Sequence, residues 1–185
     1  MKAAVVYDSK TGNTEKVAFA IKEGLELAGA KVFITKADKA DGIDFYDYDL
    51  ICIGSPSYQW SPLRTVTDLL LNKFHQYRND GRVKLGAPKV QEKNALIFCT
   101  YSGPHTGINE AIPVGKYMGQ FFEHLGFTVL DEWYILGEYH GSEERSTIGR
   151  MWDIRGRPSK EDLEKIKQDS ERLARRTSVN SENVQ

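Results

Sequence analysis

The sequence predicts an α/β protein with a three-layer, doubly wound fold, whose middle layer is a five-stranded parallel sheet. Apolar runs of strand length alternate with amphipathic helical patterns about five times along the 185 residues. The runs are apolar throughout, which is typical of strands buried on both faces of a sheet. Neither an internal repeat nor a second-domain boundary interrupts the alternation. This pattern is typical of a parallel sheet that is covered by helices on both sides.

The first part of the chain predicts two strands and one helix. Ala3–Tyr7 is the first buried strand, and a helix follows from about Thr14. The apolar residues of this helix share one face, and they are Val17, Ile21, Leu25 and Ala28. Gly29 stands where the helix is expected to end, and Lys31–Thr35 alternates like a strand near the sheet edge. The polar stretch 37–49 predicts a short or irregular connection.

The third strand, Leu50–Ile53, is fully apolar and is followed by a second helix. Ser61 before Pro62 predicts the start of that helix, because serine is a good N-cap and proline suits the first helical position. The residues expected to face inward are Leu63, Val66, Leu70, Phe74 and Tyr77. The polar stretch 78–93 then predicts a loop of unusual length.

The remaining strands and helices follow the same alternation. Ala95–Thr100 predicts the fourth strand, and a helix is expected from about Pro113 to Gly126. Thr128–Leu130 and Trp133–Leu136 predict a fifth strand, in one piece or in two.

The last helix is expected to start at Ser159, since Asp162 three residues later completes a capping box. Its buried stripe is Leu163, Ile166 and Leu173. We therefore expect one domain over residues 1–176, with a long loop at 138–158, and a mobile tail at 177–185.

Composition excludes several classes of function. A net charge of −1 argues against a nucleic-acid-binding surface. No apolar run has the length of a secretory leader or a membrane span, so we expect a cytoplasmic protein without membrane contact. Cys52 and Cys99 lie inside apolar runs and predict small core residues rather than redox or metal-binding groups. The four histidines show no metal-ligand spacing, so no metal is expected.

Three chemically distinctive loops follow strand ends: 9–14, 55–61 and 100–107. In an open parallel sheet, ligands bind beyond the carboxyl ends of the strands. The first loop offers the hydroxyls of Ser9, Thr11 and Thr14, with Gly12 permitting close backbone approach. Hydroxyls and backbone N–H groups at a helix start suit a phosphate. The alternative is an ordinary strand-to-helix turn with a Thr or Asn cap.

The other two loops have a different chemical character. Tyr58 and Trp60 offer flat apolar faces, and the third loop combines Tyr101 with two glycines and a histidine. A planar aromatic ligand with a phosphate tail would suit the three loops together.

The sequence resembles the flavodoxin-like family, which binds flavin mononucleotide (FMN). The matching stretches are Ser9–Thr14, Gly54–Tyr58 and Thr100–Gly103, and the resemblance covers about residues 1–137 and 159–176. It implies the strand order 2-1-3-4-5, with the phosphate held in the first loop and the ring between the other two. The residues expected at the cofactor are Ser9, Lys10, Thr11, Gly12, Asn13, Thr14, Pro56, Ser57, Tyr58, Gln59, Trp60, Thr100, Tyr101, Ser102, Gly103, His105 and Gly107. We expect Trp60 to stack on the ring.

Three features differ from a typical one-electron carrier of this family. The chain is nearly neutral, and loops 55–61 and 100–107 contain no Asp or Glu that would repel a reduced, anionic flavin. Loop 55–61 also lacks the glycine that lets carriers flip a peptide, and Pro56 and Pro62 stiffen it. We therefore expect two-electron, NAD(P)H-linked reduction of a quinone, flavin or similar small molecule, as in the reductase branch of the family.

Two other classes of function stay open: a non-enzymatic one-electron carrier that meets a redox partner protein, and a flavin-free interaction or signalling domain. The flavin itself performs the hydride step in the reductase branch, so no side chain is assigned a catalytic role. His105 is the candidate for tuning the flavin, or else a loop histidine with a backbone hydrogen bond.

Loop 138–158 carries four arginines and Trp152. One interpretation is a lid or subunit contact beside the flavin, with an arginine meeting the phosphate of a nicotinamide cofactor. The alternative is a solvated loop packed by Met151 and Trp152. An exposed Trp152 would also favour a homodimer.

Overall fold

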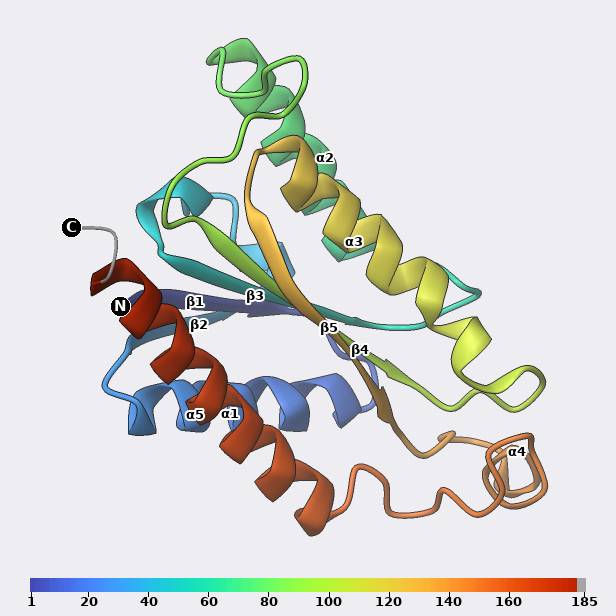
Figure 1. The fold of residues 1–185 in the computed structure, drawn as a ribbon. Coiled ribbons are helices and arrows are strands. Elements are labelled where there is room, and N and C mark those ends of the chain that lie inside the picture. The colour runs from blue at the N-terminus through green and yellow to red at the C-terminus, as the bar shows by residue number, and fades with distance from the viewer. Residues whose placement is uncertain (183–185) are drawn as a thin grey trace.

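The computed structural model describes the backbone of residues 1–182 and the side chains of residues 1–177. Its centre is a five-stranded sheet in the order β2-β1-β3-β4-β5, in which every neighbouring pair is parallel (Figure 1). The strands are β1 (Lys2–Tyr7), β2 (Lys31–Lys36), β3 (Leu50–Pro56), β4 (Asn94–Tyr101) and β5 (Thr128–Leu136). The predicted fold class and strand order are therefore confirmed.

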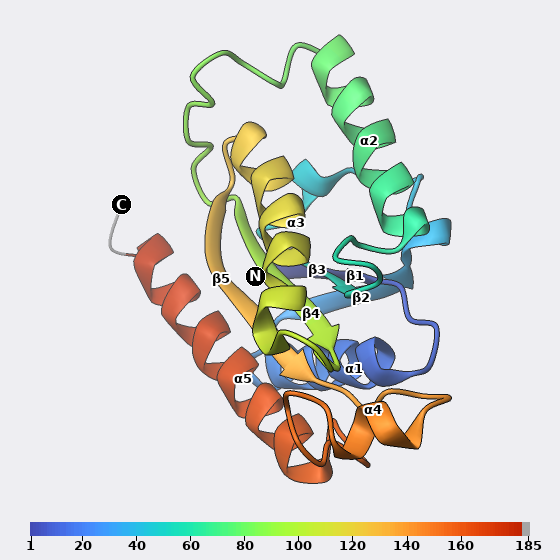
Figure 2. The same ribbon diagram turned by 90° about the vertical axis from the view of Figure 1, so that its right-hand side faces the viewer.

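Helices cover both faces of the sheet. α1 (Asn13–Leu27) and α5 (Lys160–Glu182) lie on one face, and α2 (Arg64–Asn79) and α3 (Ile112–His124) lie on the other (Figure 1). The short α4 (Glu143–Thr147) belongs to the connection between β5 and α5. Figure 2 shows this connection beyond the end of the sheet, next to α1. Three short 3-10 turns complete the chain: η1 (Ala37–Lys39), η2 (Phe45–Asp47) and η3 (Gly107–Glu110).

The sheet separates two apolar cores, because alternate side chains of the central strands point to opposite faces. On the α2–α3 side the core is aromatic, and Phe45 contacts Phe121 and Phe122 with ring centroids 6.0 Å and 5.7 Å apart. On the α1–α5 side it is mainly aliphatic, with Tyr7 and Phe98 as its buried aromatic residues. Cys52 lies in the second core and Cys99 in the first, and burial raises the pKa of both thiols. Both cysteines are the core residues that the sequence predicted.

The predicted start of the second helix is wrong. α2 begins at Arg64 with Leu63 as its N-cap, and no side chain caps it. Ser61 lies outside the helix because its backbone exchanges two hydrogen bonds with Tyr58, of 3.0 Å and 3.1 Å. Ser61 and Pro62 predicted a helix start, but Ser61 is the last residue of this turn and the helix begins only after it.

The fifth strand is one continuous piece with a bulge at Leu130. Ala95 pairs with Val129 and Leu96 pairs with Asp131, so Leu130 has no partner residue on β4.

The last helix starts as predicted. Asp162 accepts the N–H of Ser159 at 2.7 Å, and Ser159 Oγ accepts the N–H of Asp162 at 3.2 Å, which is a reciprocal capping box. The helix was expected to end near Arg176 but continues through Glu182. The end of the expected tail, 183–185, lies outside the described residues. Within the part of the chain that is described, no helix has the length and apolarity needed to cross a membrane.

Candidate functional site

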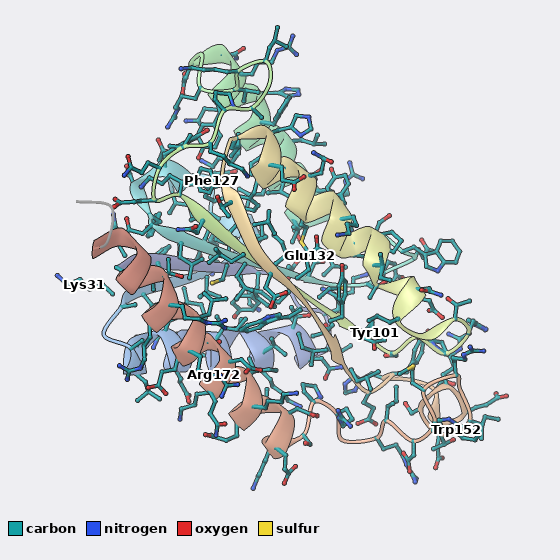
Figure 3. The ribbon with its side chains drawn as sticks, viewed as in Figure 1. Lys31, Tyr101, Phe127, Glu132, Trp152 and Arg172 are labelled. Carbon is teal, nitrogen blue, oxygen red and sulfur yellow. The ribbon has the colours of Figure 1, made fainter. Side chains whose placement is uncertain are left out.

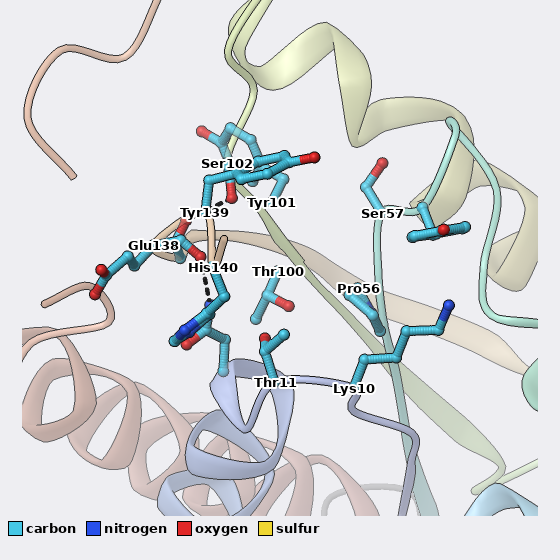
Figure 4. A pocket seen from close by; sticks show the side chains of 13 residues that line it. Lys10, Thr11, Pro56, Ser57, Thr100, Tyr101, Ser102, Glu138, Tyr139 and His140 are labelled. Atoms are coloured by element: carbon cyan, nitrogen blue, oxygen red, sulfur yellow. Dashed lines mark hydrogen bonds between the residues drawn. The ribbon is translucent and has the colours of Figure 1, made fainter. Parts of the chain in front are cut away.

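Four segments meet at the carboxyl ends of β1, β3, β4 and β5 and enclose a pocket of about 180 Å³ (Figure 4). It is lined by Lys10, Thr11, Asn13, Pro56, Ser57, Tyr58, Thr100, Tyr101, Ser102, Gly137, Glu138, Tyr139 and His140. The three loops singled out in the sequence therefore each supply residues to one pocket. Pockets that enclose a whole small molecule measure roughly 300–1,000 Å³. A nucleotide-sized ligand would consequently extend out over the adjoining surface.

The first loop delivers the start of α1 to the pocket. Gly12 is the N-cap of α1 with φ of +91°, a backbone conformation that suits glycine. Ser9 Oγ accepts the N–H of Gly12 at 3.1 Å, so Ser9 shapes the turn and does not line the pocket. The first-turn N–H groups of a helix have no intrahelical partner and carry partial positive charge. Together with the hydroxyl of Thr11 they form a place where an anion can bind.

The next two residues, Asn13 and Thr14, join this loop to other segments. Thr14 is 1% exposed, and its hydroxyl shares a 2.8 Å hydrogen bond with that of Thr100, so it holds two loops together from behind the pocket. Asn13 Nδ2 donates to the carbonyl of Glu138 at 3.0 Å. Asn13 is 7% exposed, and its Oδ1 is buried without a hydrogen-bond partner. Such an acceptor calls for a partner that the protein itself does not supply, such as a ligand group or a water molecule.

The second loop supplies Pro56, Ser57 and Tyr58. Ser57 is held by its backbone N–H, which donates to the carbonyl of Thr100 at 2.8 Å. The Tyr58 ring lies 3.8 Å from Lys10 Nζ, an attractive cation–π contact. Gln59 and Trp60 form the tip of the turn and lie outside the pocket, with Trp60 65% exposed.

The third loop supplies Tyr101 and Ser102, and Ser102 Oγ donates to the carbonyl of Gly137 at 2.7 Å. Gly103 and Gly107 shape the loop instead of lining the pocket, because a Cβ on Gly103 would lie 2.6 Å from the carbonyl oxygen of Gly107. His105 also lies outside the pocket lining, and its backbone N–H donates to the carboxylate of Glu110 at 2.8 Å. This position agrees with the alternative that His105 is an ordinary loop residue and does not tune the flavin.

Residues 137–140 form a fourth wall, which the sequence analysis missed. They follow β5 directly and are fixed by two bonds to buried Ser146: its Oγ accepts the N–H of Tyr139 at 3.0 Å and donates to the carbonyl of Tyr139 at 3.1 Å. Figure 4 shows Tyr139 and His140 across the pocket from Pro56 and Lys10. The rule that ligands bind at the carboxyl ends of parallel strands also applies to β5. It would have indicated this segment.

The structure also places two carboxylates at a site where the loops themselves contain none. Glu138 lines the pocket, and Glu110 meets the backbone of loop 100–107 through the N–H groups of His105 and Thr106. Loops 55–61 and 100–107 contain no Asp or Glu, as the sequence shows, but the segment after β5 adds Glu138 to the pocket lining.

The arginine-rich connection is held largely by its own contacts. Arg155 pairs with Asp153 at 2.7 Å, and Arg145 lies 4.8 Å from the Tyr139 ring centroid. Met151 packs against the core, whereas Trp152 is 79% exposed and lies at the outer end of the connection (Figure 3).

Two other properties limit the chemistry of the site. Burial raises the pKa of Tyr101, so its hydroxyl stays protonated at neutral pH and can donate a hydrogen bond. Among the described residues, no group of three or more His, Cys, Asp or Glu is arranged to hold a metal ion.

A parallel sheet with this strand order, an anion site at its first helix and aromatic rings at its carboxyl edge defines a doubly wound nucleotide-binding protein. Residues 5–165 match the flavodoxin family model, and the chain belongs to the flavodoxin family. Family membership implies a redox protein that binds flavin, in the form of FMN.

Individual relatives are distant or match over part of their length. A flavodoxin from Aquifex aeolicus (strain VF5) is 35% identical over 74 residues, which span 37% of this chain and 40% of that protein. The flavodoxin of Streptococcus pneumonia TIGR4 has a TM-score of 0.63 at 18% identity, covering 94% of this chain and 98% of that one. A flavodoxin, WrbA-like protein from Agrobacterium tumefaciens has a TM-score of 0.57 at 17% identity, covering 96% and 97%. These two structural matches show a shared fold.

The residues of the pocket fit FMN. The start of α1 and Thr11 offer N–H and hydroxyl donors for a phosphate. The buried, unpartnered Oδ1 of Asn13 offers an acceptor for a ligand hydroxyl. Tyr58 and Tyr139 give the pocket aromatic walls on which a flat ring can pack. These residues would hold the phosphate, the sugar chain and the ring in turn.

Proposed function

We propose that this protein binds FMN and transfers electrons in two-electron steps, from NADH or NADPH to a quinone, a flavin or a similar small acceptor. The bound flavin supplies the capacity to accept and release hydride. The residues of the chain bind it, orient it and leave it accessible. A second hollow of about 460 Å³ shares Lys10 and Tyr58 with the pocket, and so offers space for a second molecule beside the flavin.

The observation that supports two-electron chemistry is the fixed turn after β3. Gln59 and Trp60 have φ of +49° and +62°, and the backbones of Tyr58 and Ser61 are hydrogen-bonded across them. Two positive φ values in a two-residue hairpin turn are those of a type I′ turn. The turn is further held at its base, since Ser55 Oγ accepts the N–H of Leu63 at 2.8 Å.

This turn resists a peptide flip. Reversing the peptide between Gln59 and Trp60 would convert the type I′ turn into type II′, which places its first central residue near φ +60° and ψ −120°. Glycine adopts that conformation readily, but a residue with a Cβ is strained there by about 1–3 kcal/mol. In carriers of this family a flip in this loop favours the transfer of single electrons. Gln59 therefore favours two-electron transfer.

The second candidate function is a one-electron carrier that docks on another redox protein. The observation that favours it is an acidic residue in the pocket lining, Glu138. Negative charge near the ring opposes the formation of an anionic reduced flavin. Negative charge at this place therefore favours one-electron transfer, whereas the fixed turn favours two-electron transfer.

An anaerobic absorbance titration separates the two functions. The protein is reconstituted with FMN, and NADH, NADPH and dithionite are added stepwise in separate samples. We expect a nicotinamide nucleotide to bleach the flavin in a single stage, with colour restored by a quinone. Failure of both nucleotides, together with two-stage bleaching by dithionite, would instead establish the carrier. Failure to retain FMN would leave the flavin-free alternative.

A further inference from the structure

The pocket contains a histidine that the family resemblance did not assign, His140. It lines the same pocket as Thr11 and Asn13, and Figure 4 shows it beside Thr11 near the start of α1. The carbonyl of Glu138 is 3.0 Å from Asn13 Nδ2, which fixes the distance between the two segments. Two further residues span at most about 7 Å of chain. The imidazole is therefore within reach of an anion bound at the start of α1.

The other charged groups around His140 are engaged elsewhere. Lys10 Nζ lies over the Tyr58 ring, and the Glu138 carboxylate accepts the N–H of Gly156 at 2.9 Å. On α1, the carboxylate of Glu15 accepts from the hydroxyl of Tyr7 at 2.8 Å and pairs with Lys36 at 3.4 Å.

The nearby helix α4 carries three charged side chains, Glu143, Glu144 and Arg145, and two of them are bound within their own segment. Arg145 donates to the hydroxyl of Tyr139, and Glu143 pairs with Arg155 at 3.5 Å. Among the described residues, none forms a hydrogen bond or ion pair with the imidazole of His140.

We propose that His140, as an imidazolium, binds the terminal phosphate of FMN and makes the recognition of that phosphate depend on pH. This inference rests on the FMN binding of the proposed function. A histidine titrates near pH 6.5 and a phosphate monoester near pH 6, so around neutrality both charged forms are accessible. Each charge favours the other, because opposite charges in contact stabilise both ionised forms. A neutral imidazole would not attract the phosphate in this way, so this contact is expected to weaken as pH rises.

The test compares FMN with riboflavin, which lacks the phosphate, between pH 6.5 and 8.5. We expect the Kd of FMN for the unaltered protein to rise by about two- to fivefold over this range, the size of an exposed ion pair. The Kd of riboflavin stays constant. In His140→Gln, FMN binding at pH 6.5 is weaker than in the unaltered protein, and the rise of Kd with pH disappears. His105→Gln is the matched control, since His105 lies outside the pocket, and it behaves like the unaltered protein.

A second measurement reads the histidine directly. The pKa of His140, followed by NMR, is expected to rise when FMN is added and to stay unchanged with riboflavin. If FMN binds but His140→Gln keeps the pH dependence of the unaltered protein, the role of His140 is overturned and the proposed function stands. If FMN does not bind at any pH, both fall.

Discussion

Two residues far apart in sequence position the walls of the pocket. Asn13 begins α1 and Gly137 follows β5, yet a Cβ on Gly137 would lie 2.7 Å from Nδ2 of Asn13 and 3.1 Å from its Cγ. This absence of a side chain lets Asn13 reach the carbonyl of Glu138. The phosphate loop and the segment 137–140 are thus held together by one amide and one glycine.

Replacing Gly137 by alanine should therefore weaken FMN binding. The new methyl group displaces the Asn13 amide, and its hydrogen bond to Glu138 is lost. A lost hydrogen bond of about 1 kcal/mol corresponds to roughly a fivefold increase in Kd. FMN fluorescence quenching measures the change. Gly42→Ala is the control, because a Cβ there meets no atom within 4 Å, and an equal loss in both variants would contradict the role of Gly137.

At this scale the sequence predicted residue types better than contacts. The hydroxyls of loop 9–14 were expected at the phosphate, but Thr14 is 1% exposed and bonded to Thr100, 86 positions along the chain. A contact of that kind depends on the relative placement of β1 and β4, which no local pattern contains. His140 was missed for the same reason, since its role depends on the contact between Glu138 and Asn13.

At the scale of the elements, we expect the turn between β3 and α2 to determine whether a peptide near the ring can flip when the flavin is reduced. Gln59→Gly removes the strain that opposes a peptide flip, so we expect reduction by dithionite to change from one stage to two. Spectroelectrochemical titration of FMN-loaded protein would reveal the added stage as a separation of the two potentials. Ser61→Gly serves as a control, because Ser61 flanks the turn outside its two central positions and does not line the pocket. Single-stage reduction in Gln59→Gly would show that the turn does not control the electron count.

A second connection, between η2 and the end of α2, is stabilised by charge. Arg82 bonds Asp44 at 2.7 Å and lies over the rings of Tyr46 and Tyr77, 4.9 Å and 4.4 Å from their centroids. Partial burial of Asp44 would raise the pKa of its carboxyl, but the hydrogen bonds from Arg82 and the Tyr46 backbone, with the charge of Arg82, hold the pKa below its usual value.

The lowered pKa of Asp44 implies a dependence of stability on pH. The stabilisation is fully present above the unfolded-state pKa near 3.9 and is lost as pH falls through the lower folded-state pKa. Asp44→Asn should therefore lower the free energy of unfolding at pH 7, by about 1 kcal/mol or less for a partly exposed pair. The difference from the unaltered protein should shrink below pH 4. Urea denaturation at several pH values tests this, and a difference that is constant down to pH 2.5 would exclude the ion pair as its source.

The elements themselves were mostly predictable. Apolar runs such as Ala3–Tyr7 and Leu50–Ile53 indicate buried strands, and the Ser159–Asp162 box marks the start of α5, because both signals act within a few residues. The start of α2 was wrong because Ser61 belongs to the preceding turn, whose positive φ values fall on residues other than glycine and so left no signal in the sequence. The fourth wall of the pocket was missed because residues 137–140 resemble ordinary polar loop in composition.

At the scale of the whole molecule, the candidate site lies at the carboxyl end of the sheet, away from the amino end of its strands. Tyr101 marks the carboxyl end of β4 beside the pocket, whereas Lys31 and Phe127 lie at the opposite end (Figure 3). The pocket is built from segments that follow four of the five strands, and these strands share two continuous cores. Ligand binding at this edge should therefore stabilise the folded state as a unit.

This coupling gives a quantitative expectation. A ligand that binds the folded state alone stabilises it by RT ln(1 + [L]/Kd), so FMN at a hundred times its Kd should raise the free energy of unfolding by about 2.7 kcal/mol. Urea denaturation with and without FMN measures this value, and hydrogen exchange locates it. Local protection should increase most at 9–14, 55–61, 100–107 and 137–140, because these segments close over the ligand. Equal protection gained at residues 29–31, at the opposite end of the sheet, would mean that FMN acts through global stability alone. In that case, segments 9–14 and 137–140 would be as closed without the ligand as with it, and the Asn13–Glu138 contact would be sufficient to hold them.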